Sequence, residues 1–268
     1  KSSVMLRLIS AFTLLLACSH AFIQPVALRP RSSLFVEKVE GNPSYKKVFV
    51  AGGTKGVGKC IVESLSKSGV DIVCVARSDE AVSSLNAMDN VVCHKGDAFD
   101  YKSIEDNMWG CDAVITTLGG TTEEGRRVDY EGNNNVIEAA GILGVTRVVL
   151  VTSIGCGDSK DAAPPAVFEA LKDVLADKEK AERVLQRYYT NTNWTIIRPG
   201  GLKSEAMTGK AILTEDKLAI GSIHREDVAD LVIKALKSSG TKKKILSAVD
   251  MSLGSNVGGE REVEEFQL

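Results

Sequence analysis

The stretch that decides the fold is Val50-Ala51-Gly52-Gly53-Thr54-Lys55-Gly56-Val57-Gly58, a glycine-rich loop between two segments of opposite character. The apolar run 48–50 before it is short and β-branched, as a buried strand requires. The segment 56–68 after it repeats its apolar residues at helical spacing. A strand that turns through glycines directly into a helix is how a doubly wound α/β fold holds a phosphate group.

The three glycines of the motif have separate tasks in this interpretation. Gly52 makes the tight turn, Gly56 allows close approach to the backbone, and Gly58 lets the helix pack against the strand. A dinucleotide pyrophosphate needs a backbone without Cβ atoms and with free N–H groups at a helix N-terminus. The alternative is a glycine-rich turn that binds nothing. A second strand at 72–75, where the dinucleotide motif demands one, favours dinucleotide binding.

The rest of the chain alternates between strand-like and helix-like segments. The strand-like runs are continuous, as in buried parallel strands, and lie at 48–50, 71–75, 91–93, 113–115, 148–151 and 195–197. Helices are expected at 56–68, about 124–143, about 168–188 and 225–236. This order predicts an α/β fold with a doubly wound parallel sheet, the Rossmann fold. We expect one such domain over 41–250, with a small C-terminal substrate-side insert, and an acidic tail over 251–268 that is frayed from Gly258 on.

Arg77, just past the second strand, decides the expected cofactor. A dinucleotide without a 2′-phosphate usually meets a carboxylate about 20 residues past the glycines, but this sequence has Arg77 there. A guanidinium can pair with the adenosine 2′-phosphate, and Lys55 adds positive charge nearby. NADP(H) is therefore preferred over NAD(H). The alternative is that Arg77 is only solvated and that Asp79 selects NAD(H).

Further motifs make the chain resemble the atypical short-chain dehydrogenase/reductase family, in its NAD(P)H-binding branch. These motifs are GDAFD at 96–100, TLGG at 117–120, VDYEGNNNVIEAA at 128–140, TSIG at 152–155, IRPGGL at 197–202 and IHREDVA at 223–229. The resemblance covers residues 46–250. It implies an adenine contact at Asp97, a segment passing over the nicotinamide at 197–202, and a bracing role for Asn135.

Loop, strand ends and resemblance together give one set of predicted cofactor-binding residues. They are Gly52, Gly53, Thr54, Lys55, Gly56, Val57, Gly58, Arg77, Asp97, Ala98, Leu118, Gly119, Gly120, Ser153, Lys178, Pro199, Gly200, Gly201 and Leu202.

The catalytic residues are where the sequence departs from the family. The resemblance implies a Tyr-x-x-x-Lys pair, in which the Tyr hydroxyl passes the proton while the Lys lowers its pKa and holds the ribose. Lys178 matches the Lys, but the Tyr position is Val174. Ser153 and Lys178 remain as the candidate catalytic residues. The alternatives are a Ser153 hydrogen-bonded to backbone at a strand end and a Lys178 solvated on a charged helix face. His224 is expected to be a cap or surface residue.

Three functions are compatible with these residues. The first is an NADPH-dependent reductase of a small conjugated metabolite, which transfers hydride directly and dispenses with the Tyr. The second is non-catalytic NADP(H) binding as a redox-sensing or assembly factor of plastid or thylakoid protein complexes, a role that the resemblance permits. The third is a nucleotide-sugar isomerase or epimerase. We rank it last, because that chemistry also relies on the Tyr and usually needs a larger substrate domain than 202–225 provides.

Composition limits the function classes. With 268 residues, 44% hydrophobic and 25% charged, the chain is neither wholly disordered, collagen-like nor a polytopic membrane protein. Residues 1–36 carry four basic and no acidic side chains; taking this +4 from the total of −2 leaves −6 for the rest. That charge gives no reason to expect nucleic acid as a partner. Positive charge for an anionic cofactor must then be local, at Arg77 and Lys55.

The first 40 residues are interpreted as a presequence. The apolar run 6–17 is followed by small residues, as in a secretory signal, and then by the basic, acid-free segment 22–33, as in a transit peptide. Together with Ser19-His20-Ala21-Phe22 this resembles the bipartite presequence of proteins sent to the secondary plastids of algae. The alternative is a secretory signal followed by a linker. We expect a plastid protein whose mature part has no membrane span.

Cysteines give little sign of a disulfide framework or a metal site. The five beyond the presequence are odd in number, without a C-x-x-C pair, and lie at Cys60, Cys74, Cys93, Cys111 and Cys156. Neither His94 nor His224 has a partner at ligand spacing. We expect buried free thiols that act as small hydrophobes, and no metal.

Overall fold

The computed structural model describes residues 44–189, 191–254 and 262–268. The expected presequence at 1–40 lies outside the described residues. The strands are β1 Lys47–Ala51, β2 Asp71–Ala76, β3 Val91–Lys95, β4 Ala113–Thr116, β5 Arg147–Val151, β6 Asn193–Pro199, β7 Gly201–Lys203, β8 Ile212–Thr214, β9 Ser222–His224 and β10 Lys244–Val249. The helices are α2 Gly56–Lys67, α3 Asp79–Asn86, α4 Tyr101–Met108, α5 Val128–Ile142, α6 Pro165–Tyr188 and α7 Arg225–Lys237, with 3₁₀ turns η1 Gly157–Ala162 and η2 Met251–Leu253.

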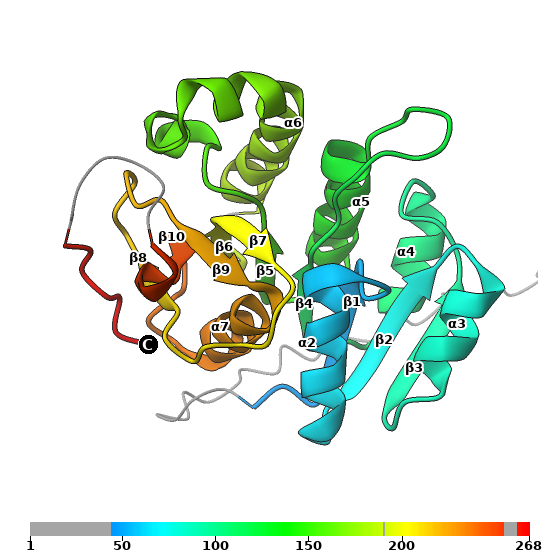
Figure 1. Ribbon diagram of the computed structural model, residues 1–268. Coiled ribbons are helices and arrows are strands. Elements are labelled where there is room, and N and C mark those ends of the chain that lie inside the picture. The colour runs from blue at the N-terminus through cyan, green and yellow to red at the C-terminus, as the bar shows by residue number, and fades with distance from the viewer. Residues whose placement is uncertain (1–43, 190, 255–261) are drawn as a thin grey trace, which may run out of the picture. The chain divides into compact units, whose positions relative to one another are not determined.

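Eight strands form one sheet, in the order β3-β2-β1-β4-β5-β6-β10-β8 (Figure 1). All neighbours pair in parallel except β8, which runs antiparallel to β10. Chain order reverses between β1 and β4, where Val50 of β1 lies between Cys74 of β2 and Ile115 of β4. The expected doubly wound parallel sheet is confirmed. A crevice at the carboxyl ends of β1 and β4 is where such sheets bind ligands.

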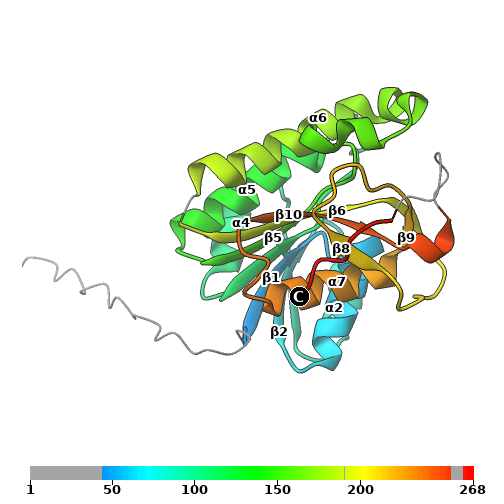
Figure 2. The same ribbon diagram turned by 90° about the vertical axis from the view of Figure 1, so that its left-hand side faces the viewer.

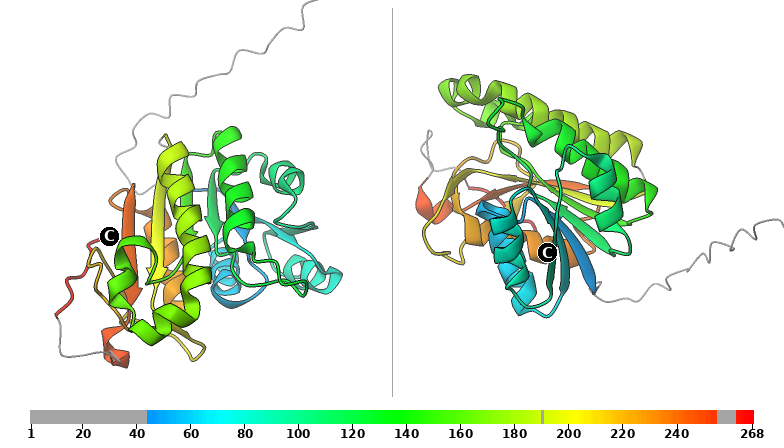
Figure 3. Two further views of the ribbon diagram at one scale, coloured as in Figure 1. Left: turned by 90° about the horizontal axis from the view of Figure 1, so that it is seen from above. Right: turned by 90° about the vertical axis from the view of Figure 1, so that its right-hand side faces the viewer.

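Helices cover both faces of the sheet, so that the strands are buried on both sides (Figure 2). One face packs α2, α3 and α7 on a core that includes Val50, Ile61 and Val232. The other packs α4, α5 and α6 on a core that includes Phe49, Ile137 and Leu185. Seen from above, α5 and α6 lie side by side (Figure 3, left). No helix of the described residues is long and apolar enough to cross a membrane.

Arg147 of β5 fixes the far end of α7. Its fully buried guanidinium donates hydrogen bonds to the carbonyls of Ala235 and Leu236, at 2.5 and 3.1 Å, in the last turn of that helix. Burial lowers the pKa of this guanidinium to about 10. The carbonyls that a helix end leaves unpaired are thereby satisfied. This contact and the apolar residues of α7 in the core together hold the helix on the sheet.

The elements differ from the sequence prediction in three places. The helix expected from about 124 begins at Val128, because Gly125 adopts a positive φ of 83° within a tight turn between Thr121 and Arg127. Helices α3 and α4 and strands β7, β8, β9 and β10 were not predicted. The tail expected to be frayed is not so at its end, where the Phe266 N–H donates to the Leu213 carbonyl at 2.7 Å and the ring packs on the core.

The cysteine thiols lie where the sequence predicted. Cys74, Cys93, Cys111 and Cys156 are buried and free, and Cys60 is half-buried. Burial raises the pKa of the Cys156 thiol to about 12 and that of Cys93 to about 11. At neutral pH these thiols are protonated, and they act as packing groups.

Candidate functional site

Two adjoining cavities open at the carboxyl ends of the strands. The larger encloses about 810 Å³ and the smaller about 160 Å³, and both are lined by Lys55, Thr117, Gly119 and Gly120. We call the two together the cleft. It lies at the reversal of strand order, where the sequence predicted the site. Every residue predicted to bind the cofactor lines it except Gly53.

The glycine loop forms the floor of the cleft. Gly52 has a φ of 84°, and a Cβ there would lie 2.7 Å from Thr117 Oγ1. A Cβ on Gly58 would lie 2.1 Å from the Gly52 carbonyl oxygen, so only glycine permits this approach. Gly53 instead faces inward, since its Cβ would meet Val62 at 2.9 Å. The loop thus has the tight turn and the close helix packing that the sequence predicted.

Helix α2 begins at Gly56 without the usual compensation for its first N–H groups. Its N-cap residue Lys55 makes no side-chain cap, and its first turn holds no carboxylate. Gly56 has a φ of 57°, and a Cβ there would have open space around it except for Arg225. Unpaired N–H groups and the positive end of the helix dipole therefore face the cleft, an arrangement that suits an anion.

The smaller cavity is the end at which an adenosine would lie. Arg77 lines it, is exposed, and follows β2 as predicted. The rival for its role, Asp79, forms an ion pair with Lys95 at 2.8 Å. Asp97 also lines this cavity, and its Oδ1 accepts the Phe99 N–H at 3.0 Å. The turn that carries Ala98 is held to helix α5 by Asn135, whose Nδ2 donates to the Ala98 carbonyl at 2.9 Å.

Lys178 faces the larger cavity and is fixed there by a buried carboxylate. Its Nζ lies 2.8 Å from Oδ1 of Asp129; the Lys178 side chain is 13% exposed and that of Asp129 fully buried. Oδ2 of Asp129 accepts the Gly120 N–H at 3.1 Å. A Cβ on Gly119 would come within 3.0 Å of both charged groups. Lys178 is therefore not a solvated residue on a charged face, and sequence reasoning did not identify Asp129 as its partner.

Ser153 and Val174 line the same cavity. The Ser153 hydroxyl donates to the Ile154 carbonyl at 3.0 Å, the strand-end hydrogen bond that was the alternative to a catalytic role. Val174 stands one helical turn before Lys178, at the position where the family's Tyr was expected. Among the residues that the structure describes, no tyrosine lines either cavity.

One wall of the larger cavity is apolar although it is open to solvent. Val167 and Leu171 of α6 and Leu202 of β7 line it and are 48%, 44% and 42% exposed. Ile154, Ala163 and Ile220 continue this wall. Large apolar side chains left exposed around a cavity mark a surface that a ligand covers.

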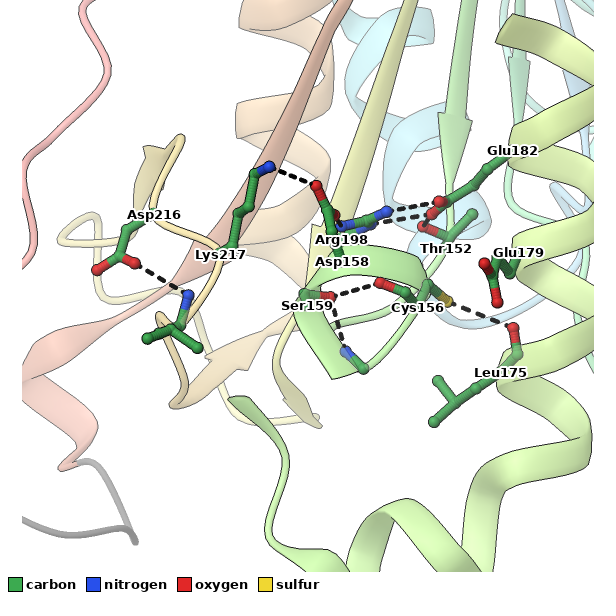
Figure 4. A network of polar contacts seen from close by, with 12 residues as sticks. Thr152, Cys156, Asp158, Ser159, Leu175, Glu179, Glu182, Arg198, Asp216 and Lys217 are labelled. Atoms are coloured by element: carbon green, nitrogen blue, oxygen red, sulfur yellow. Dashed lines mark hydrogen bonds and ion pairs between the residues drawn. The ribbon is translucent and has the colours of Figure 1, made fainter. Parts of the chain in front are cut away.

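A buried charge network holds the strand ends behind the cavity (Figure 4). Arg198, at the end of β6, donates from Nε and Nη2 to the Glu182 carboxylate at 3.0 and 2.7 Å. Glu182 also accepts the Thr152 hydroxyl at 2.6 Å. The network joins α6 to the residues that immediately precede Ser153 and Pro199.

Arg225 is a further cleft residue that the sequence prediction missed. It is the first residue of α7, lines the larger cavity, and donates from Nη1 to Ser204 Oγ at 2.6 Å. Its neighbour His224 is the N-cap residue of α7, one of the two places expected for it, but it is buried, with Nδ1 3.3 Å from Glu205 Oε2. Arg225 lies about 170 residues beyond the glycine loop. No local motif links two such distant segments.

Comparison with known proteins gives a consistent picture. A model of the NAD(P)H-binding family matches residues 52–239. The uncharacterized sugar epimerase YhfK of Bacillus subtilis is 32% identical over 78% of this chain and 94% of its own length. The uncharacterized chloroplastic protein At2g34460 of Arabidopsis thaliana is 30% identical over 86% of this chain and 87% of its own length.

Two further similarities bear on function. Chloroplastic Protein TIC 62 of Pisum sativum is 27% identical over 69% of this chain, which spans 39% of that longer protein. Among solved structures, the anaerobilin reductase ChuY of Escherichia coli O157:H7 superposes with a TM-score of 0.70 at 28% identity, covering 76% of this chain and 97% of ChuY.

Proposed function

The chain belongs to the NAD(P)H-binding family of atypical short-chain dehydrogenase/reductase-like proteins, and from this premise we propose that it is an NADPH-dependent reductase of a conjugated small molecule. The observation that carries the proposal is the large apolar-walled cavity beside Lys178 and Ser153, which no tyrosine enters. Such a cavity has room for a substrate next to a nicotinamide, but it offers no phenol as a proton donor.

The residues of the cleft fit a nicotinamide dinucleotide. Gly56 and Gly120, with φ of 57° and 114°, leave the space over the loop open. Lys55 and Arg77 line the cleft, and the pKa of the Glu124 carboxyl is lowered by a backbone hydrogen bond and also by the charge of Arg77. When bound, the reduced nicotinamide would supply the hydride for the reduction. Gly200–Leu202 would pass over its ring, as the motif at 197–202 implies.

NADPH is the proposed form because of Arg77. A planar guanidinium at the adenosine end suits the 2′-phosphate that distinguishes NADPH from NADH. Asp79, which would select NADH, is already paired with Lys95. Arg77→Ala is expected to weaken NADPH binding about tenfold or more and to leave NADH binding unchanged. Equal losses for both cofactors in titration calorimetry would contradict the preference.

Lys178 is the proposed proton donor. Asp129 holds its ammonium at the cavity wall, where it can hold the ribose or donate a proton toward a substrate oxygen or nitrogen. Ser153 can turn its hydroxyl from the Ile154 carbonyl to a substrate acceptor. A conjugated substrate spreads the charge left by hydride addition, so protonation by Lys178 or water suffices without the phenol. The apolar wall at Val167, Leu171 and Leu202 suits such a molecule, and the name of ChuY, a reductase of anaerobilin, supports this class.

The test is NADPH oxidation with a panel of quinones, flavins, enones and a bilin. We expect turnover with at least one extended conjugated acceptor and none with a simple ketone. Asp129→Asn, which frees Lys178 but keeps the shape of the side chain, should lower kcat about tenfold or more. Lys180→Met, on the exposed face of α6, is the matched control and should change nothing. Tight NADPH binding without turnover on any acceptor would refute the reductase.

A second candidate function is non-catalytic binding of NADP(H) in a plastid or thylakoid protein complex. The similarity to Protein TIC 62 favours it, although the chain spans only 39% of that protein. Failure of every acceptor, together with co-purification of the protein with a thylakoid complex, is the outcome that would select it. An epimerase, the activity in the name of YhfK, ranks third: the insert between β6 and α7 holds only the short strands β7, β8 and β9.

We propose a plastid location on the strength of the presequence and the chloroplastic relatives. A fluorescent protein fused behind residues 1–40 and expressed in an alga with secondary plastids should enter the plastid. Phe22→Ala should divert it from the plastid into the secretory route, while Phe12→Ala, inside the apolar run, is the control. Secretion of the unaltered fusion would contradict the proposal.

A further inference from the structure

We propose that Arg225 binds the cofactor pyrophosphate, as a ligand contributed by the last helix of the domain and lying outside the glycine loop. The proposal rests on dinucleotide binding in the cleft, as argued above. It assigns to Arg225 a phosphate different from the one expected at Arg77.

The first step is the placement of two helix ends. Helices α2 and α7 pack side by side on one face of the sheet (Figures 1 and 2). Each begins at the edge of the cleft, α2 with Gly56 and α7 with Arg225. The Arg225 Nε lies 3.8 Å from the position that a Cβ on Gly56 would occupy. The guanidinium is thus held over the loop where a pyrophosphate meets the backbone in this fold.

The second step is charge. A cation in the first turn of a helix is disfavoured by the helix dipole, unless an anion compensates it. No described carboxylate forms an ion pair with Arg225, whose side chain donates a hydrogen bond to the neutral hydroxyl of Ser204. The carboxylates that follow it are engaged elsewhere, because Glu226 accepts the Met207 N–H and Asp227 accepts the N–H groups at 208 and 209. A ligand anion would supply the missing partner.

The third step is geometry. A guanidinium offers several N–H donors in one plane, which match the oxygens of a phosphate two at a time. Arg225 lines the larger cavity and Arg77 only the smaller one, while Lys55 lines both. One cation therefore stands at each phosphate position. Arg225 serves the pyrophosphate, which NADPH and NADH share, and Arg77 the 2′-phosphate, which only NADPH carries.

The experiment titrates the full chain with NADPH, NADH and adenosine 2′-monophosphate by calorimetry. Arg225→Ala should weaken NADPH and NADH equally, by about tenfold to hundredfold, and leave adenosine 2′-monophosphate unchanged, because that ligand has no pyrophosphate. Arg77→Ala should weaken NADPH and adenosine 2′-monophosphate and leave NADH unchanged. Arg225→Lys keeps the charge and should lose less than Arg225→Ala. Arg187→Ala, an exposed Arg on α6 that lines neither cavity, is the matched control.

A purely structural role for Arg225 would give a different result. Ser204→Ala removes the hydrogen bond to Arg225 but keeps the guanidinium. It should leave NADPH binding within about twofold of the unaltered protein. The proposal is overturned if Ser204→Ala weakens NADPH as much as Arg225→Ala does, if Arg225→Ala also weakens adenosine 2′-monophosphate, or if it leaves both dinucleotides unaffected. Absence of dinucleotide binding in the unaltered protein would refute the proposed function instead.

Discussion

Removing one member of the buried pair between Glu182 and Arg198 is expected to be among the most destabilising single substitutions in the domain. The Glu182 side chain is 1% exposed and that of Arg198 4%. The carboxylate accepts two bonds from the guanidinium and a third from Thr152. Burial opposes the charge on Arg198, but the hydrogen bonds that it donates to Glu182 and Asp158 raise the pKa of Arg198 above its usual value. Glu182→Gln keeps the shape of the side chain and removes the charge.

The magnitude follows from what the substitution leaves behind. An amide offers one acceptor oxygen where the carboxylate offered two, so part of a buried guanidinium loses its partner. Removing one member of a buried ion pair costs about 3–5 kcal/mol. For a domain of this size that lowers Tm by roughly 6–20 °C, at about 2–4 °C per kcal/mol. It is a large share of the ~5–15 kcal/mol by which such a domain is stable.

Asp158→Asn is the matched control, because Asp158 binds the same guanidinium from the solvent side. Its side chain is 44% exposed, and Arg198 Nη1 lies 2.6 Å from Oδ1. An exposed pair contributes only about 0–1 kcal/mol. The assay is urea unfolding of each variant, with midpoint and slope both measured. If Glu182→Gln costs no more than Asp158→Asn, burial is not what makes the network strong, and the reasoning is wrong.

Three further predictions concern the loop, the acid limb and the missing phenol. Gly58→Ala should abolish dinucleotide binding, because the new Cβ would meet the Gly52 carbonyl oxygen at 2.1 Å; titration calorimetry checks it, and unchanged affinity would contradict the structure of the loop. Burial raises the pKa of the Asp158 carboxyl, but hydrogen bonds from a lysine and an arginine lower it by more, so that the net shift is downward. The contribution of Asp158 to stability is therefore complete above its unfolded pKa of 3.8 and is lost as pH falls through its folded pKa. Below about pH 4, the Tm of Asp158→Asn should then fall less steeply with falling pH than the Tm of the unaltered protein. Parallel plots of Tm against pH for the two proteins would contradict this prediction. Val174→Tyr should introduce measurable reduction of a simple ketone, which the unaltered protein is expected to lack, since the phenol would stand one turn from Lys178; no gain would mean that position 174 is not the family's Tyr position.

The sequence predicted those parts of the fold whose signal lies within one contiguous segment of the chain. The six strands from β1 to β6 are continuous apolar runs, and each of the loops after β1, β2 and β4 carries its own chemistry within a few residues. Strand β10 escaped because Lys242, Lys243 and Lys244 precede its apolar residues and Ser247 interrupts them. Helices α3 and α4 escaped because each has only eight residues, too few for a helical period to stand out.

The two site residues that escaped prediction depend on tertiary contacts. Asp129 lies inside the motif at 128–140, but its carboxylate can bind Lys178 only because α5 and α6 pack against each other in the fold. Arg225 reaches the loop only because α2 and α7 pack together. The one signal that could have found Arg225 is its position: a basic residue at a helix start goes against the dipole, and local violations of that kind mark functional sites.

The same division separates the two halves of the cleft. Its cofactor half is backbone, built by glycines and strand ends whose geometry tolerates little change, as the 2.1 Å clearance at Gly58 indicates. Its substrate half is side chains on the first two turns of α6 and on β7, where Val167, Leu171 and Leu202 are 42–48% exposed and constrained by few neighbours. Substitutions there cost little stability, since the residues are not part of either main core. Substrate choice can therefore change at α6 and β7 while the cofactor site stays fixed, and it is those two elements that should be exchanged with a relative to transfer its specificity.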